Sequence, residues 1–194
     1  MYGLKPVPFN DPNAIALEAQ PTCTWFAWDC DRLTIVSAPA NLEFLRRAIQ
    51  LATENVLSGN GGPFGAVIEH EGAIVGEGVN TVTSACDPTT HAEVNAIRAA
   101  AQTLNSFSLA GCTLYTSCQP CPMCLAAAYW ARVDVIYYGA SAADAAHAGF
   151  DDAFLYEEFR KDPAQRSLPA EQLLGEEARE SFAAWKTSTS KIDY

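Results

Sequence analysis

Two cysteines stand three positions apart in Tyr115-Thr-Ser-Cys-Gln-Pro-Cys-Pro-Met-Cys, where an apolar strand pattern passes into small residues typical of a helix. If the chain is helical from Pro120 onward, the sulfurs of Cys121 and Cys124 lie on one face of the first turn. Prolines suit that place because the first N–H groups of a helix have no acceptor. The same unpaired N–H groups lower a cysteine pKa. The stretch therefore offers two thiolates to a soft or borderline cation such as zinc.

A histidine and a glutamate open a second predicted helix upstream, in Thr90-His-Ala-Glu-Val-Asn-Ala-Ile-Arg. His91 supplies a third ligand. A His/Cys/Cys set leaves a fourth position for water, which is typical of catalytic rather than structural zinc. Glu93 lies two residues from His91, close enough to reach that water without binding the metal.

Each of these features also has a purely structural interpretation. Cys118 could complete a closed Cys3His site, and Thr90 with Glu93 could form a capping box. A single Cys-x-x-Cys is a weak signal. The conjunction is stronger, because His-Ala-Glu at one helix start and Pro-Cys-x-x-Cys at the next, with a strand between, match the zinc-deaminase pattern in which glutamate transfers protons. We therefore expect a catalytic zinc.

Three stretches together carry a family resemblance: His91-Ala-Glu-Val-Asn-Ala-Ile-Arg, the cysteine stretch from Tyr115, and Gly149-Phe-Asp-Asp. They resemble the cytidine deaminase superfamily, and most of all its small bacterial guanine deaminases, over roughly residues 41–194. Gln119 stands where these relatives carry glutamate, and residues 1–40 lie outside the family pattern. The resemblance implies an α/β fold, a three-layer α/β/α sandwich with a mixed sheet of about five strands.

The resemblance also implies a reaction and its residues. The reaction is zinc-dependent hydrolytic deamination of guanine to xanthine and ammonia, with Glu93 carrying protons. Asn80 and Asp152 would hydrogen-bond the purine, and Phe64 would lie against the ring. The residues alone leave simpler roles open, since Asn80 could cap a turn, Phe64 could be a core side chain, and Asp151 with Asp152 could cap a helix.

The end of the chain, Thr187-Ser-Thr-Ser-Lys-Ile-Asp-Tyr, has the composition of a frayed terminus. The resemblance implies instead a homodimer that exchanges its C-terminal segments, so that Tyr194 closes the partner's purine pocket. Exchange of identical elements is a low-cost route to a two-fold dimer.

Composition sets limits on the function. The chain has 194 residues, 49% of them hydrophobic and 18% charged, as is ordinary for a globular domain. A net charge of −11, from 12 basic and 23 acidic residues, disfavours a nucleic-acid partner and suits a small neutral substrate. We expect neither a signal peptide nor a membrane span. Seven cysteines, an odd number, fit a reducing compartment, and we expect the cytoplasm.

The chain divides into an N-terminal extension over 1–40, with a hairpin predicted over 22–37, and a deaminase domain over 41–194. Asn41 should cap a first helix that ends before Gly59, and Glu71-Gly72 should turn a hairpin. An alternating order then predicts parallel pairing. Its segments are a loop at 81–88, a helix at 91–105, a strand at 112–117, a helix at 121–130 and a strand at 133–139, followed by helices within 140–148, 153–161 and 170–186.

Two other classes of function remain open at this stage. Another deaminase substrate would keep the chemistry and change the pocket: guanosine, cytosine, adenosine in transfer RNA, or an aminotriazine such as ammeline. A zinc-stabilised binding protein would use the metal only to hold the fold.

Overall fold

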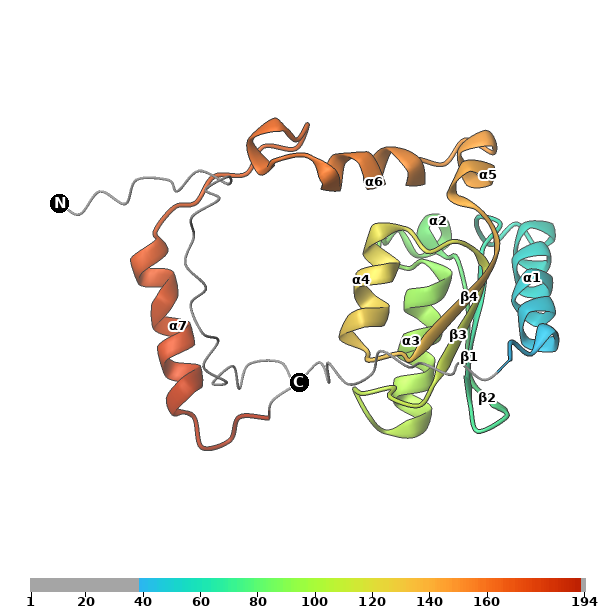
Figure 1. Ribbon diagram of the computed structural model, residues 1–194, viewed down its shortest axis with the longest axis horizontal. Helices are drawn as coiled ribbons and strands as arrows, with labels where there is room; N and C mark the ends of the chain where they lie inside the picture. Colours follow the sequence, from blue (N-terminus) through green and yellow to red (C-terminus); the bar gives the residue numbers. More distant parts are fainter. Residues whose placement is uncertain (1–38, 193–194) are drawn as a thin grey trace, which may run out of the picture. The chain divides into compact units, whose positions relative to one another are not determined.

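The computed structural model describes residues 39–192, and within them the elements alternate as the sequence predicts (Figure 1). The hairpin predicted over 22–37 and the position of Tyr194 lie outside the described residues. The elements are α1 (Leu42–Leu57), β1 (Gly65–His70), β2 (Ala73–Val79), α2 (Val82–Ala85), α3 (Ala92–Leu104), β3 (Thr113–Cys118), α4 (Pro122–Trp130), β4 (Val135–Ala140), α5 (Ala142–His147), α6 (Asp152–Arg160), the 3-10 turn η2 (Pro163–Gln165) and α7 (Gly175–Thr187).

The described strands form one mixed sheet in the order β2-β1-β3-β4. β1 is antiparallel to β2 and β3, and β3 is parallel to β4, so the predicted parallel portion is present. The sheet has four strands within residues 39–192, not about five. After β4, Ser141 and Asp144 form a capping box that starts α5, and the described elements that follow are helical.

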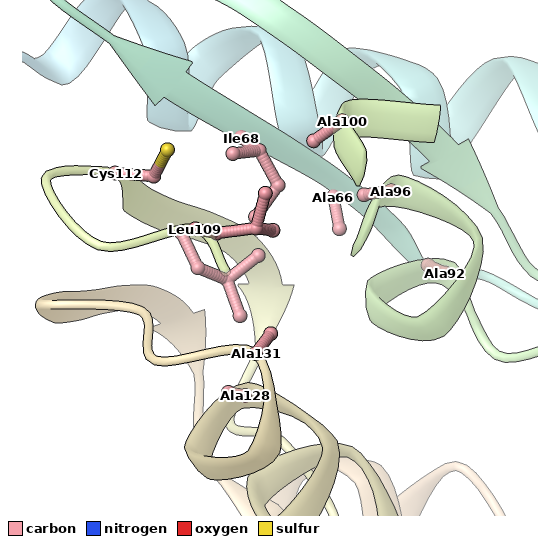
Figure 2. Close-up of a cluster of buried hydrophobic side chains, with 10 residues drawn as sticks. Ala66, Ile68, Ala92, Ala96, Ala100, Leu109, Cys112, Ala128 and Ala131 are labelled. Atoms are coloured by element: carbon pink, nitrogen blue, oxygen red, sulfur yellow. The ribbon is translucent and has the colours of Figure 1, made fainter. Parts of the chain in front are cut away.

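Helices cover both faces of the sheet, which gives the expected three layers (Figure 1). Alternation along the strands decides which side chain meets which helix. Val67 and Tyr115 pack with Ala48 and Leu51 of α1 on one face. On the other face, Figure 2 shows Ala66 and Ile68 in a cluster of mostly small side chains. That cluster includes Ala92, Ala96 and Ala100 of α3 and Ala128 and Ala131 at α4.

The contact between β2 and α3 is backbone against backbone. A Cβ added at Gly76 would lie 2.5 Å from the carbonyl oxygen of Ala96, and one added at Gly78 would lie 2.2 Å from that of Ala92. Only glycine leaves room for this approach. This close packing therefore fixes the distance between the start of α3 and the end of β2.

Local signals mark the element boundaries well. The Asn41 side chain accepts a hydrogen bond from the Glu43 N–H at 2.9 Å and caps α1 as predicted. The loop predicted over 81–88 contains the short helix α2, so that part of the prediction is wrong in detail. None of the helices described over 39–192 combines the length and apolar character that crossing a membrane requires. The cytoplasmic location stays a prediction.

Candidate active site

Two helix starts bring the metal-binding side chains together. His91 is the N-cap residue of α3, and Cys121 is the N-cap residue of α4, which has Pro122 in its first turn. Neither cap residue makes a side-chain capping bond. The capping box considered for Thr90 and Glu93 is therefore not formed, which leaves the Glu93 carboxylate available for other contacts.

The spacing of the three ligand atoms fits zinc. Nδ1 of His91 lies 3.6 Å from Sγ of Cys121 and 3.5 Å from Sγ of Cys124. All three atoms lie within 4.8 Å of one another. Zn–S bonds of about 2.3 Å and Zn–N bonds of about 2.0–2.1 Å at tetrahedral angles place nitrogen and sulfur roughly 3.6 Å apart. The donor set and its geometry therefore suit a tetrahedral zinc ion.

Cys118 does not belong to this group. Its thiol donates to the carbonyl oxygen of Ser141 at 3.5 Å. Burial raises the pKa of Cys118 to about 11, which favours the thiol over the thiolate that a metal requires. Among the described residues the ligand group has three members, and a tetrahedral metal there keeps its fourth position open.

Hydrogen bonds among the three ligand residues shift their pKa values. A hydrogen bond from Cys124 and a second one with His91 lower the pKa of Cys121 to about 4. The same contact with Cys121 raises the pKa of His91. Cys121 stands at a helix N-terminus, whose N–H groups stabilise negative charge on the triad.

Glu93 lies beside the triad without belonging to it. The residue is only 5% exposed, and burial raises the pKa of its carboxyl group. The hydroxyl of buried Thr116 on β3 donates to its Oε1 at 3.4 Å. A buried carboxyl group next to metal ligands is placed to accept and release protons.

A cavity of about 210 Å³ opens onto these groups. Pockets that take drug-sized ligands measure about 300–1,000 Å³, so this one suits a smaller molecule. Apart from Cys124, each described side chain predicted for the site lines it. The lining residues are Gly62, Phe64, Asn80, Val82, Thr83, His91, Glu93, Gln119, Cys121, Phe150 and Asp152.

Asn80 and Asp152 bring polar groups to the cavity from two elements. Oδ1 of Asn80 accepts from the N–H of Val82 at 3.2 Å, so the turn-capping role is real. Its Nδ2 has no partner among the described residues and remains a donor. Asp152 is the first residue of α6, and the preceding N-cap, Asp151, makes no side-chain bond. Burial raises the pKa of Asp152, and negative charge on Cys121 raises it further.

Comparison with known proteins identifies the family. A family model for the cytidine and deoxycytidylate deaminase zinc-binding region matches residues 39–140. The chain belongs to this deaminase family. Guanine deaminase of Bacillus subtilis (strain 168) is 52% identical over 151 residues, which are 78% of this chain and 97% of that protein. The ligand triad of this deaminase lies inside the zinc-binding region, and its cofactor is zinc.

Solved structures and a second relative give the same family. The X-ray structure of guanine deaminase from Bacillus subtilis matches with a TM-score of 0.77 at 50% identity, covering 80% of this chain and 99% of that one. The tRNA-specific adenosine deaminase of Aquifex aeolicus (strain VF5) is 40% identical over 92 residues, which are 47% of this chain and 60% of that protein.

Some cavity residues of the deaminase were not predicted from sequence. The Phe150 ring meets the Phe64 ring edge-on, with centroids 4.7 Å apart. Phe150 belongs to the motif Gly149-Phe-Asp-Asp, in which the sequence analysis assigned a substrate role to Asp152 and none to the phenylalanine. Gln119 lines the cavity, and its Oε1 accepts from the N–H of Ala142 at 3.2 Å. Tyr156 of α6 donates to the carbonyl oxygen of Pro120 at 2.6 Å and so ties α6 to the approach to α4.

Substitution of the cysteines separates ligand from neighbour. Cys124→Ala should lose most of the bound zinc, because two protein ligands hold the metal far more weakly than three. Cys118→Ser should bind as much zinc as the unsubstituted deaminase, since its sulfur is not in the triad. Metal analysis after gel filtration measures both. Zinc loss in Cys118→Ser would show instead that Cys118 closes a structural site.

Proposed function

We propose that this deaminase converts guanine and water to xanthine and ammonia. The supporting observation is that one small cavity is lined by two members of the zinc triad, a buried glutamate, two polar side chains and an aromatic ring. The guanine deaminase of Bacillus subtilis, 52% identical and covered over 97% of its length, supports the choice of substrate.

Each group in the cavity has a task in that reaction. Zinc, when bound, supplies the Lewis acidity that makes water nucleophilic near neutral pH. Glu93 takes a proton as the water oxygen bonds to ring carbon 2 and delivers that proton to ring nitrogen 3. It then takes the remaining hydroxyl proton and delivers it to the amine, which leaves as ammonia. A pKa raised by burial suits a carboxyl group that must act alternately as base and acid.

Recognition of the ring rests on three side chains. The free Nδ2 hydrogens of Asn80 donate to acceptors of the purine. The Asp152 carboxylate accepts from a ring N–H. Phe64 lies against the ring face, and the edge of Phe150 holds the Phe64 ring in place.

The rival functions fit the cavity less well. Transfer RNA requires a basic surface, whereas this chain carries a net charge of −11. The 52% identical guanine deaminase of Bacillus subtilis supports guanine over guanosine, cytosine and ammeline. A zinc-stabilised binding protein gives no reason to bury Glu93, because a buried carboxyl group without an ion-pair partner costs stability.

The decisive test of the proposed activity is Glu93→Gln. Zinc content and folding should be unchanged because Glu93 is not a ligand. Turnover should fall by about 10²–10⁴-fold because the amide cannot carry the proton. Ammonia release from guanine, cytosine, adenine, guanosine and cytidine measures activity and preference together, and guanine should be preferred. Near-normal turnover would remove Glu93 from this role, and inactivity of the unsubstituted protein on the whole panel would favour the binding-protein alternative.

Asp152→Asn tests recognition of the ring N–H. The change keeps the shape and removes the charged acceptor, so kcat/KM for guanine should fall about tenfold to hundredfold. Asp151→Asn is the matched control because Asp151 is exposed, adjacent and outside the cavity. Equal effects of the two substitutions on kcat/KM would argue against a contact between Asp152 and substrate.

We further propose a homodimer that exchanges its C-terminal segments. Support comes from α7, which has no buried residue and exposes Phe182 at 66% and Trp185 at 42%. Apolar side chains on one helix favour a second surface that covers them. In the exchanged dimer Tyr194 of one subunit closes the purine cavity of the other, excludes water and adds a phenol hydrogen bond.

Complementation tests the exchange. Glu93→Ala chains and chains truncated after Lys186 should each be inactive alone. When the two are unfolded and refolded together, the Glu93→Ala chain lends its intact tail to the truncated chain's intact zinc site, so activity should return. Mixed dimers that form and stay inactive would mean that the tail does not act across the dimer.

A further inference from the structure

A buried asparagine outside the cavity joins two of the cavity's walls. Asn55 lies in the last turn of α1 and is only 4% exposed. Its Nδ2 donates to the carbonyl oxygen of Gly62 at 2.8 Å and to that of Asn80 at 2.8 Å. Its Oδ1 accepts from Nδ2 of Asn60 at 3.1 Å. Both amide hydrogens of Asn55 are thus used on backbone carbonyls that belong to different elements.

Those two carbonyls belong to the segments that carry the ring-binding side chains. The N–H of Phe64 donates to the carbonyl oxygen of Gly62 at 2.8 Å, and the N–H of Asn80 donates to that of Phe64 at 3.1 Å. Gly62 lies between them, since a Cβ added there would be 3.5 Å from the Phe64 ring and 3.6 Å from the Asn80 carboxamide carbon. Asn55 therefore lies behind the point where the segment that carries Phe64 meets the segment that carries Asn80.

A primary amide is the side chain that this position requires. Two carbonyl oxygens directed at one point repel each other unless donors lie between them, and leaving either buried oxygen unpaired costs stability. The approach is close, because a Cβ added at Gly61 would lie 2.0 Å from the carbonyl oxygen of Asn80. A leucine offers no donor, and a serine offers one for two acceptors.

We propose that Asn55 is a positioning residue for substrate recognition. By joining the carbonyls of Gly62 and Asn80, it sets the separation between the Phe64 ring and the Asn80 amide, and hence the width of the slot that receives the base. Asn55 does not line the cavity and acts only through these two residues. The inference rests on the proposed function, in which the slot holds a purine base.

Kinetics and hydrogen exchange on zinc-loaded protein test this role. Asn55→Leu should lower kcat/KM for guanine by about tenfold to hundredfold, mostly through KM, because a slot that is no longer held at the width of the base binds the base less tightly. Bound zinc should stay at the level of the unsubstituted protein, since the triad lies on other elements. The backbone amides of Phe64 and Asn80 should exchange their hydrogens faster than in the unsubstituted protein. Asn55→Ser, with one donor, should be intermediate in both measurements.

Phe44→Ala controls for a general loss of stability. Phe44 packs on Tyr115 in the apolar cluster near the other end of α1, so its loss should lower Tm while KM stays within about twofold. The inference is overturned if the Asn55 variants keep the KM of the unsubstituted protein, or if Phe44→Ala raises KM equally. If Asn55→Leu does not fold, Asn55→Ser decides by the same two readouts.

These measurements distinguish failure of the Asn55 inference from failure of the proposed function. An unsubstituted protein that releases no ammonia from guanine would refute the guanine assignment. The exchange rates of the Phe64 and Asn80 amides would still report whether Asn55 holds the slot together. Unchanged exchange rates in both Asn55 variants would overturn the inference whatever the substrate.

Discussion

The active site depends on the distance between two helix starts at one end of the sheet, and backbone packing sets that distance. Gly76 and Gly78 let the backbone of α3 approach β2 so closely that no side chain fits between them. The cluster on the same face consists largely of alanines, which holds α3 and α4 near the sheet with little freedom to shift (Figure 2). His91 and Cys121 inherit their separation from this packing. Zinc tolerates errors of only a few tenths of an ångström in the positions of its ligands. Those positions are set here by packing contacts between residues that do not bind the metal.

The same packing makes an unfavourable carboxyl group tolerable. Glu93 is buried with a hydrogen bond from Thr116 and without a described ion-pair partner, so its pKa is raised. In an ordinary core such a group would be selected against, since an apolar residue of the same size would stabilise the fold. Sites that break a rule of stability in this way are where chemistry is expected. The rigid surroundings keep the carboxyl group beside the metal ligands and prevent it from turning toward solvent.

Sequence reasoning succeeded where the chemistry is local. Cys121 and Cys124 lie three positions apart at a helix start, so spacing alone predicts their common face. His91 and Glu93 both stand at the start of the other helix, which places them near the same end of the sheet. Phe150 and Asn55 were missed for the opposite reason. Phe150 matters through contact with Phe64, far along the chain, and an asparagine near the end of a helix looks like an ordinary polar residue until its acceptors are known. The strand number was overestimated because the count of about five came from the family resemblance, whereas the segments predicted over 41–194 contain four strands, as the described sheet does. The role of Tyr194 stays a prediction.

The segment of Asn80, which is proposed to bind the base, is joined by hydrogen bonds to the segment of the metal ligand His91 at the end of β2. Asn55 reaches this point from α1, and Asn95 reaches it from α3, where its Nδ2 donates to the carbonyl oxygen of Val79 at 2.9 Å and to that of Thr90 at 3.3 Å. The N–H of Thr81 donates to the same Thr90 carbonyl at 3.0 Å. Successive carbonyls at the end of β2 are therefore bound by carboxamides from helices on opposite faces of the sheet. Because Thr90 precedes the metal ligand His91, these bonds join the segment that follows Asn80 to the start of α3. In the proposed function, orientation of the purine relative to the zinc centre therefore depends on the backbone on both sides of the cavity, because a reacting carbon must arrive within reach of a fixed nucleophile.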